Sequence, residues 1–402
     1  MMIRNRFLVS CAISMGFLGL FSASDSQAAD VQTINETPQE NTDIQKKIRT
    51  FLDQENPNLS KKFPFLLHLF EDGQIAKNNA GVRIAESPDQ FPVIEKIPTT
   101  KLSGLLFYYK LFNQAMRVPH WHANAVEMGL VVNGQMKITI WDGPADSSVF
   151  TVGKGGMWMI PQASVHCLEN VGNDELDFIV TYNSAYAEDR DFSTAWAALP
   201  DIILEKSLGL SADDISTLKK TTKNRLSLFD VDDTLTSKNI PSPYTVLFPE
   251  IDPLYSTSLG SITRVDETNW PAMKYMAMQQ TVMKPGTIRE PHWYSASDVL
   301  FFVKNGKAFF TLMDSEGIVY KVILEVGDLV FIPVGTFHTF VNVGMDDLEV
   351  YETFTSSGPL KEIDILSASA HFRKGILSGS TGVNQESLRK LQEKGQVYMR
   401  SL

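Results

Sequence analysis

The sequence contains little cysteine, with two among 402 residues. Cys11 lies in an N-terminal stretch that we expect to be removed, so Cys167 is the one thiol expected in the mature chain. A single thiol cannot form an internal disulfide, so an exported chain would depend on hydrophobic cores or subunit contacts for its stability. On a strand Cys167 would point away from the preceding His166, and we expect it to be a small buried hydrophobic residue, not a nucleophile.

Positive charge is also scarce. The 36 Lys and Arg residues are outnumbered by 47 Asp and Glu, which gives a formal net charge of −11. Proteins bind nucleic acids largely through Lys and Arg contacts with phosphates, and no basic block or stripe is present. A nucleic-acid partner is therefore excluded, and any anion-binding site must be local.

Long apolar runs are absent except at the N-terminus. The run from Phe7 to Phe21 follows Arg4 and Arg6 and precedes small residues at Ser26 and Ala28. It is shorter than the roughly 20 residues that span a bilayer. Residues 1–28 are thus predicted to be a signal peptide of a secreted or periplasmic protein that has no membrane contact after cleavage. The alternative is an uncleaved membrane anchor.

What the sequence does contain is an internal repeat. Adding 172 to a position in the first half reaches a matching residue in the second half, without any net insertion between the matched points. The shared residues are uncommon types, which makes chance a poor explanation, and two copies of one domain are predicted. The matches are Arg117 with Arg289, Pro119-His120-Trp121 with Pro291-His292-Trp293, Asn133-Gly134 with Asn305-Gly306, Gly155 with Gly327, Pro161 with Pro333, His166 with His338, and Asn170 with Asn342.

Each repeat has the pattern of a β domain. Residues 137–140 alternate polar and apolar side chains, as a half-buried strand does. Both Asn-Gly pairs lie between apolar runs, which is typical of a hairpin turn. Short helices are expected over 193–208, from Ser211 with Asp214 completing a capping box, and over 384–394. The polar segment 218–245 is the expected linker.

The first repeat carries a candidate metal site. His120 and His122 are two residues apart and would share one face of a strand. Glu127 can return from the neighbouring strand, and His166 arrives through the second run of the repeat. Three imidazoles and one carboxylate suit Mn²⁺ or Fe²⁺, and also Zn²⁺, Ni²⁺ or Cu²⁺. A metal ion bound by these four side chains is the central prediction.

The second repeat has lost part of this set. Tyr294 stands at the position of His122, and Val299 at the position of Glu127. His292 and His338 remain, together with Arg289. A metal-free barrel is expected here, kept for folding, assembly or anion binding through Arg289. The alternative is a Tyr–His site for ferric iron.

The two runs of the first repeat resemble the paired motifs of the cupin superfamily. Gln114 and Ala163 stand where the motifs usually have glycine, whereas Gly286 and Gly335 occupy the equivalent positions in the second repeat. The resemblance implies a mainly β fold of two tandem cupin barrels, each a double-stranded β-helix or jelly roll, with short helical extensions. The predicted domains are the signal peptide 1–28, a flexible arm 29–58, a metal-binding cupin domain 59–222 with a helical extension, and a cupin domain 223–402 with a degenerate metal site and a C-terminal helix.

Two such domains behind a signal peptide resemble the oxalate decarboxylase family of bicupins. This resemblance implies Mn²⁺, with dioxygen as a co-catalyst, acting on oxalate or another small carboxylate to give formate and CO₂. Arg117 matches the arginine of that family that contacts oxalate, and Glu188 matches the proton-donating acid of its lid. The neighbours Ala187, Asp189 and Arg190 depart from the lid pattern. The family also forms trimers and hexamers, so a homo-oligomer is expected.

Three functions therefore remain open from the sequence. The first is a carboxy-lyase that resembles oxalate decarboxylase. The second is an oxalate oxidase, or another cupin oxidoreductase or isomerase that acts on a small carboxylate. The third is a bicupin that binds a metal or ligand without catalysis. One fold supports all three, so the residues of the site must decide.

Overall fold

The computed structural model describes residues 38–85, 104–141, 143, 147–221, 224–229, 242–356, 360–389 and 397–402. The predicted signal peptide, residues 1–28, lies outside this part of the chain, as do the centre of the expected linker and residues 390–396. None of the described helices is long and apolar enough to cross a membrane.

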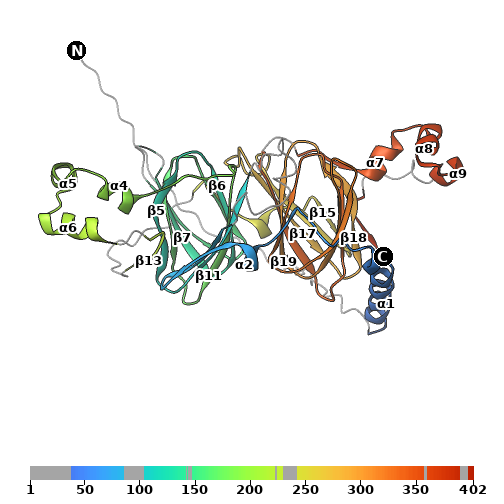
Figure 1. The fold of residues 1–402 in the computed structure, drawn as a ribbon, viewed down its shortest axis with the longest axis horizontal. Helices are drawn as coiled ribbons and strands as arrows, with labels where there is room; N and C mark the ends of the chain where they lie inside the picture. The colour runs from blue at the N-terminus through green and yellow to red at the C-terminus, as the bar shows by residue number, and fades with distance from the viewer. Residues whose placement is uncertain are drawn as a thin grey trace, which may run out of the picture. The chain divides into compact units, whose positions relative to one another are not determined.

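The first barrel consists of two antiparallel sheets (Figure 1). One sheet has the strand order β14-β9-β6-β11-β4-β3-β2, and the other has the order β12-β5-β10-β7-β8 with β13 also paired to β5. Antiparallel strands facing a common core produce the alternating burial that the sequence predicted. The strands are β2 (Gln74–Asn78), β3 (Gly81–Ala85), β4 (Leu105–Leu111), β5 (Ala115–His122), β6 (Glu127–Asn133), β7 (Gln135–Trp141), β8 (Ser148–Gly153), β9 (Gly156–Ile160), β10 (Val165–Asn170), β11 (Leu176–Tyr182), β12 (Asp189–Asp191), β13 (Leu226–Leu228) and β14 (Thr245–Leu247).

The second barrel repeats this arrangement. Its sheets have the orders β1-β22-β19-β24-β17-β16-β15 and β21-β20-β23-β18-β25, with β26 also paired to β18. The two-barrel β fold predicted from the repeat is confirmed. The strands are β1 (Leu66–His68), β15 (Tyr255–Thr257), β16 (Gly260–Val265), β17 (Ala277–Met283), β18 (Thr287–Tyr294), β19 (Val299–Asn305), β20 (Ala308–Met313), β21 (Val319–Leu324), β22 (Asp328–Ile332), β23 (His338–Asn342), β24 (Leu348–Phe354), β25 (Glu362–Asp364) and β26 (Met399–Ser401).

The two barrels exchange a short strand. Strand β1 precedes the first barrel in the chain, yet it pairs with β22 of the second barrel. Strand β14 follows the linker, yet it pairs with β9 of the first barrel. The expected boundary at 222/223 therefore does not separate the sheets, because each barrel completes one sheet with a strand from the other side of that boundary.

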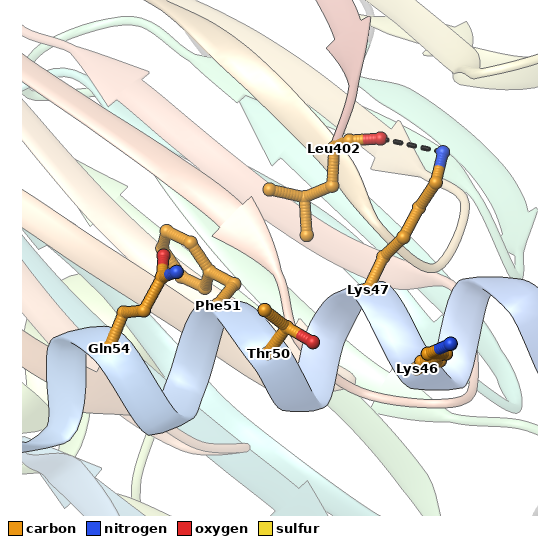
Figure 2. A pocket seen from close by; sticks show the side chains of 6 residues that line it. All are labelled: Lys46, Lys47, Thr50, Phe51, Gln54 and Leu402. Atoms are coloured by element: carbon orange, nitrogen blue, oxygen red, sulfur yellow. Dashed lines mark hydrogen bonds between the residues drawn. The ribbon is translucent and has the colours of Figure 1, made fainter.

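The segment predicted as a flexible arm, residues 29–58, contains a regular helix in its described part. Helix α1 spans Pro38–Glu55 and is followed by a short 3₁₀ turn, η1 (Asn56–Asn58). Ile48 is buried against the second barrel, where it clusters with Phe309 and Val341. Lys47 donates a hydrogen bond to the Leu402 carbonyl at 2.8 Å (Figure 2). The arm was a wrong prediction here, because a few apolar residues in a polar segment are enough to bury one face of a helix.

Short helices follow each barrel. After the first come α4 (Phe192–Ala197), α5 (Asp201–Leu208) and α6 (Ala212–Lys220), and the capping box of Ser211 with Asp214 is present as predicted. After the second come α7 (Ile365–Ala370), α8 (Lys374–Thr381) and α9 (Gln385–Leu388). The helix expected over 384–394 starts where predicted, and residues 390–396 lie outside the described part. Helices α7 and α8, the short α2 (Leu69–Asp72) and the 3₁₀ turn η3 (Phe248–Glu250) were not predicted.

The two positions where cupin motifs usually have glycine keep a glycine-like backbone. Gln114 has φ 54° and Ala163 has φ 64°, and they are the non-glycine residues with positive φ in the described chain. The equivalent Gly286 and Gly335 have φ 71° and 74°. The turn geometry has therefore been kept in the first barrel, at the steric cost that a Cβ atom imposes in this region.

Candidate metal centre

A β-bulge on β5 decides which side chains enter the first barrel. Strand β10 pairs His166 with His120 and Leu168 with Arg117. The two paired positions are three residues apart on β5 but only two apart on β10, so β5 contains one extra residue. Residues three apart on a regular strand face opposite sides, but one extra residue restores the same side. Arg117 and His120 are therefore both buried inside the barrel, together with His122.

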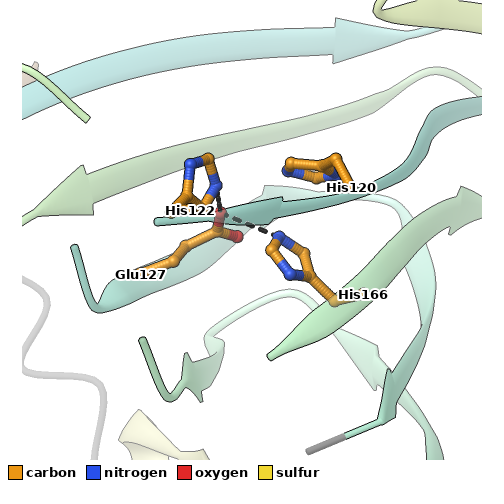
Figure 3. Close-up of side chains that lie close together, drawn as sticks. All are labelled: His120, His122, Glu127 and His166. Carbon is orange, nitrogen blue, oxygen red and sulfur yellow. Dashed lines mark hydrogen bonds and ion pairs between the residues drawn. The ribbon is translucent and has the colours of Figure 1, made fainter. Parts of the chain in front are cut away.

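The four predicted metal ligands converge in this interior (Figure 3). The donor atoms of His120, His122, Glu127 and His166 all lie within 4.8 Å of one another, and all four side chains are buried. Glu127 Oε2 lies 3.0 Å from His122 Nε2 and 3.2 Å from His166 Nε2. Strands β5, β6 and β10 supply these groups, as the spacing of the two motifs predicted.

Backbone carbonyls orient two of the three histidine rings, those of His120 and His166. His120 Nδ1 lies 2.7 Å from the Val118 carbonyl oxygen, and His166 Nδ1 lies 3.0 Å from that of Ser164. A carbonyl can only accept, so the proton of each ring must be on Nδ1 and the lone pair on Nε2. His120 Nε2 is buried without a hydrogen-bond partner. A buried imidazole lone pair beside a carboxylate is the donor arrangement that a transition-metal ion requires, and the site fits one.

Two aromatic residues that the sequence analysis missed hold Glu127. Trp158 Nε1 donates to Glu127 Oε1 at 3.0 Å, and the Tyr182 hydroxyl lies 3.4 Å from Oε2. A Cβ atom on Gly129 would lie 2.0 Å from the Trp158 ring, so the indole fits only because this neighbour is glycine. No spacing rule connects Trp158 with Glu127, which is why the sequence did not single it out.

The electrostatics of the site favour an ionised Glu127 and a neutral His120, whereas Asp189 and Glu127 outweigh burial at His122 and raise the pKa of that histidine. Burial acts to raise the pKa of Glu127, but the neighbouring His166 and His122 outweigh it, so this pKa lies well below its usual range. Burial, with the charge of Arg117, holds the pKa of His120 well below its usual value. These are the protonation states in which carboxylate and imidazole bind metals.

A third missed residue, Asp189, links the metal ligands to Arg117. Its Oδ1 lies 3.0 Å from His122 Nδ1, at ion-pair distance although without a linear hydrogen bond. Its Oδ2 lies 3.1 Å from Arg117 Nη2 and 2.7 Å from Arg225 Nη1. Burial opposes the charge of Asp189, but His122 and Arg117 hold its pKa below the ordinary value. Asp191 also binds Arg117, at 2.8 Å.

The lid segment lies along the barrel as a strand. In β12, Asp189 pairs with His122 and Asp191 with His120. Glu188, the acid expected to donate a proton, is not brought to the metal ligands. Its side chain is 49% exposed and its Oε2 accepts from Arg190 at 2.5 Å. Side chains alternate between the two faces of a strand, so Asp189 points into the barrel and its neighbour Glu188 points to solvent.

Cys167 is half-buried and lies outside the metal site. Its Sγ lies 3.3 Å from the Arg117 carbonyl oxygen, on the opposite face from His166. Burial raises the pKa of this thiol to about 12. A thiol that stays protonated is a poor nucleophile, in line with the expectation for this residue.

The second barrel contains a ligand group that the sequence analysis missed. His292, His338 and Glu352 place one donor atom each within 4.8 Å of one another, and all three are buried. Tyr294 and Val299 occupy the two positions of the lost ligands, as expected, but Glu352 comes from the neighbouring strand β24. The offset of 172 maps Glu352 to Val180, so the repeat itself gave no signal for it.

The fold and this pair of barrel interiors define a bicupin. The family model described as Cupin matches residues 68–216 and again 248–386. The chain therefore belongs to the cupin family, with two cupin domains in tandem.

Its curated relatives include oxalate decarboxylases. The chain is 27% identical over 248 residues to Oxalate decarboxylase OxdC of Bacillus subtilis, an alignment that covers 60% of this chain and 64% of the relative, slightly less than two thirds of that protein. It is 23% identical over 329 residues to a probable oxalate decarboxylase of Arthroderma benhamiae, covering 76% and 78% of the two chains. A germin-like protein of Oryza sativa is 26% identical over 110 residues, covering 27% and 48%.

Solved structures of the Bacillus subtilis oxalate decarboxylase share the fold. The structure determined at pH 4.6 superposes with a TM-score of 0.72 at 19% identity and covers 85% of this chain and 88% of that one. Another, which concerns Mn(II) centres in the same protein, gives a TM-score of 0.73 at 19% identity and covers 85% and 90%. The two-barrel fold is therefore that of a bicupin oxalate decarboxylase.

Proposed function

We propose that this bicupin is a secreted, Mn²⁺-dependent carboxy-lyase that converts oxalate to formate and CO₂ in its N-terminal barrel. The observation that carries the proposal is the buried group of His120, His122, Glu127 and His166 with Arg117 beside it. The oxalate decarboxylases among its relatives supply the substrate and the reaction. The Mn(II) centres studied in the structural relative favour manganese among the metals that three imidazoles and a carboxylate accept.

A bound ion would act as a Lewis acid that polarises a substrate carboxylate and offsets its charge. Dioxygen remains part of the proposal as a co-catalyst. The overall reaction of hydrogen oxalate is redox-neutral: the C–C bond breaks, CO₂ leaves, and the carbon that remains gains a hydrogen to become formate.

Arg117 would hold the second carboxylate of the substrate. While strand β12 is paired with β5, the Arg117 guanidinium forms ion pairs with Asp189 and Asp191. An incoming carboxylate would compete with Asp189 for this guanidinium, and separation of strand β12 from β5 would remove that competition. Closure of the lid over bound substrate would then exclude water from the reacting carbon.

Glu188 would supply the proton after this rearrangement. Its present position, half-exposed and bound to Arg190, keeps it outside the closed site. If the lid cannot bring it in, oxidation of oxalate to two CO₂ with reduction of dioxygen to hydrogen peroxide becomes the favoured outcome. The outward position of Glu188 is the observation that favours this second candidate, an oxalate oxidase.

The experiment is a product analysis. Mn²⁺-loaded protein is incubated with oxalate in air, and formate, CO₂ and hydrogen peroxide are measured. One formate per oxalate supports the decarboxylase, peroxide supports the oxidase, and no turnover supports a binding protein without catalysis. Glu188→Gln should reduce formate yield, whereas Glu205→Gln, which removes another exposed acid paired to a neighbouring Lys206, should not.

Location and assembly belong to the same proposal. The predicted signal peptide supports a secreted or periplasmic protein, and N-terminal sequencing of the exported chain tests whether cleavage occurs near Ala28. A trimer or hexamer is expected from the family resemblance, and light scattering on the purified protein tests it.

A further inference from the structure

The second barrel has replaced a lost metal ligand from a different strand. Val299 on β19 stands where Glu127 stands on β6, so this strand no longer offers a carboxylate. The neighbouring strand β24 offers Glu352 instead, on the same face as Phe354, which pairs with Val299. We propose that His292, His338 and Glu352 bind a divalent transition-metal ion in the C-terminal barrel. This proposal does not depend on the reaction assigned to the first barrel.

Both histidines are prepared for a metal in the same way as those of the first barrel. His292 Nδ1 lies 2.7 Å from the Glu290 carbonyl oxygen, and His338 Nδ1 lies 2.9 Å from that of Thr336. These contacts place the ring proton on Nδ1 and leave the lone pair on Nε2. Both Nε2 atoms are buried and have no hydrogen-bond partner. Two unpartnered lone pairs that lie within 4.8 Å of a carboxylate oxygen indicate a bound cation.

Glu352 is held in place by neutral groups only. Gln279 Nε2 donates to its Oε2 at 2.7 Å, Thr281 Oγ1 donates to the same atom at 3.1 Å, and the Tyr294 hydroxyl donates to Oε1 at 3.2 Å. A buried carboxylate without a cation is costly. These three contacts orient the carboxylate as outer partners orient a metal ligand.

The nearby arginines do not use the charge of Glu352 for an ion pair. Arg289 Nη2 is bound to Glu362 at 2.5 Å, and Arg264 Nη2 lies 3.3 Å from the same carboxylate. Glu362 thus pairs with both guanidinium groups. The charge of Glu352 is left for a cation at the two histidines, which gives the set of two imidazoles and one carboxylate that binds Fe²⁺ and related divalent ions.

The environment of this site points to a structural ion. All three ligands are fully buried. Phe310 lies parallel to the His338 ring at 6.1 Å, and Phe354 contacts Tyr294 at 4.8 Å between ring centroids. An ion enclosed in this way stabilises the folded barrel by binding it and not the unfolded chain.

The test is metal stoichiometry with Co²⁺ as the probe. Metal-free protein is loaded with Co²⁺, excess ion is removed, and cobalt per chain is measured by mass spectrometry. We expect two ions in the wild-type chain, one in Glu352→Gln, one in Glu127→Gln and none in the double variant. Glu349→Gln is the matched control, because it removes a carboxylate from the same strand, where Glu349 binds Gln280 and Tyr351. This control should keep two ions.

A thermal melt provides a readout that does not depend on activity. In the Glu127→Gln background, Co²⁺ should raise the melting temperature by several degrees, and the additional Glu352→Gln change should remove that shift. The proposal is overturned if wild-type protein binds one ion and Glu352→Gln leaves it in place, since a water molecule or a protonated carboxyl would then fill the cluster. It is also overturned if Glu352→Gln keeps two ions while His338→Ala loses one. Loss of oxalate turnover with both ions bound would contradict the proposed function alone.

Discussion

The two barrels share one topology and the same spacing of motif residues, yet different side chains fill their interiors. In the first, β6 supplies the carboxylate and Trp158 lies over Gly129 to hold it. In the second, Phe301 occupies the position of Gly129 and is fully buried, while the carboxylate comes from β24. Val330 stands at the position of Trp158, so a glycine paired with a tryptophan in the first barrel becomes a phenylalanine paired with a valine in the second. The comparison shows that both barrels bring two histidines and a carboxylate together in their interior, although the carboxylate comes from a different strand in each.

A second shared feature concerns the arginines. Arg117 is bound by Asp189 of β12, and Arg289 is bound by Glu362 at the equivalent place on β25. Both strands lie against the histidine-bearing strand, β5 or β18. Recurrence of the arginine in both repeats is therefore explained by this strand contact, and it does not by itself indicate a substrate carboxylate.

The largest expected difference between the barrels is in turnover of oxalate. Glu127→Gln should lower it by about 10³-fold, which corresponds to about 4 kcal/mol of transition-state stabilisation. Glu352→Gln should change it less than about twofold, because the second site lies outside the proposed reaction. Steady-state rates measured at saturating Mn²⁺ check both values. Equal losses of turnover in the two variants would contradict the proposal that only the first barrel carries out the reaction.

Next in size is the effect of the strand acids on metal binding in the first barrel. Asp189→Asn should weaken Mn²⁺ binding there by about 10- to 100-fold, because His122 loses the carboxylate that orients it. Glu362→Gln, the matching change in the second barrel, should leave that affinity unaltered. Competition with a fluorescent chelator measures both. If Asp189→Asn binds Mn²⁺ as tightly as wild type, Asp189 does not orient His122 for the metal, and its role is limited to the ion pair with Arg117.

A smaller effect is expected from the turn that differs between the barrels. Ala163→Gly should raise the melting temperature by about 1–2 °C, because relief of the strained φ exceeds the extra flexibility of glycine in the unfolded chain. Gly335→Ala should lower it by a similar amount. A Cβ atom at Gly335 would meet nothing within 4 Å, so only the backbone conformation is changed. Opposite signs in the two melting experiments are required.

The smallest effect concerns the exchanged strands. His68 of β1 lies 2.5 Å from Asp328, whereas β14 is tied to the first barrel through the neutral Thr245 hydroxyl. Burial lowers the pKa of His68, but the bond and charge of Asp328 outweigh it and raise this pKa above its ordinary 6.5. The folded state then binds more protons, so the stabilisation is complete below 6.5 and is lost as the pH rises through the folded pKa.

Because the His68 side chain is half-exposed, this loss should be about 1 °C in melting temperature between pH 6 and pH 8. His68→Gln should abolish the loss in metal-free protein. His371→Gln, which removes a histidine bound to the Ser367 carbonyl, should retain it. An identical pH dependence in wild type and His68→Gln would exclude the pair as its source.

The sequence by itself determined the repeat, the β character of both domains and the four first-barrel ligands. Spacing alone was enough for His120 and His122, because a strand presents every second side chain to one face. The offset of 172 also located the losses at Tyr294 and Val299. These features depend on fixed spacings along the chain, so they can be recognised from the sequence without knowledge of the fold.

Tertiary structure decided everything that depends on which strands become neighbours. The bulge on β5 turned Arg117 inward, the pairing of β12 with β5 placed Asp189 and not Glu188 against His122, and the face of β24 brought Glu352 to His292 and His338. The exchange of β1 and β14 is of the same kind. Contacts between residues far apart in the chain have no fixed spacing, and a shift of one residue reverses the face on which a side chain lies. Only the folded barrels determine them.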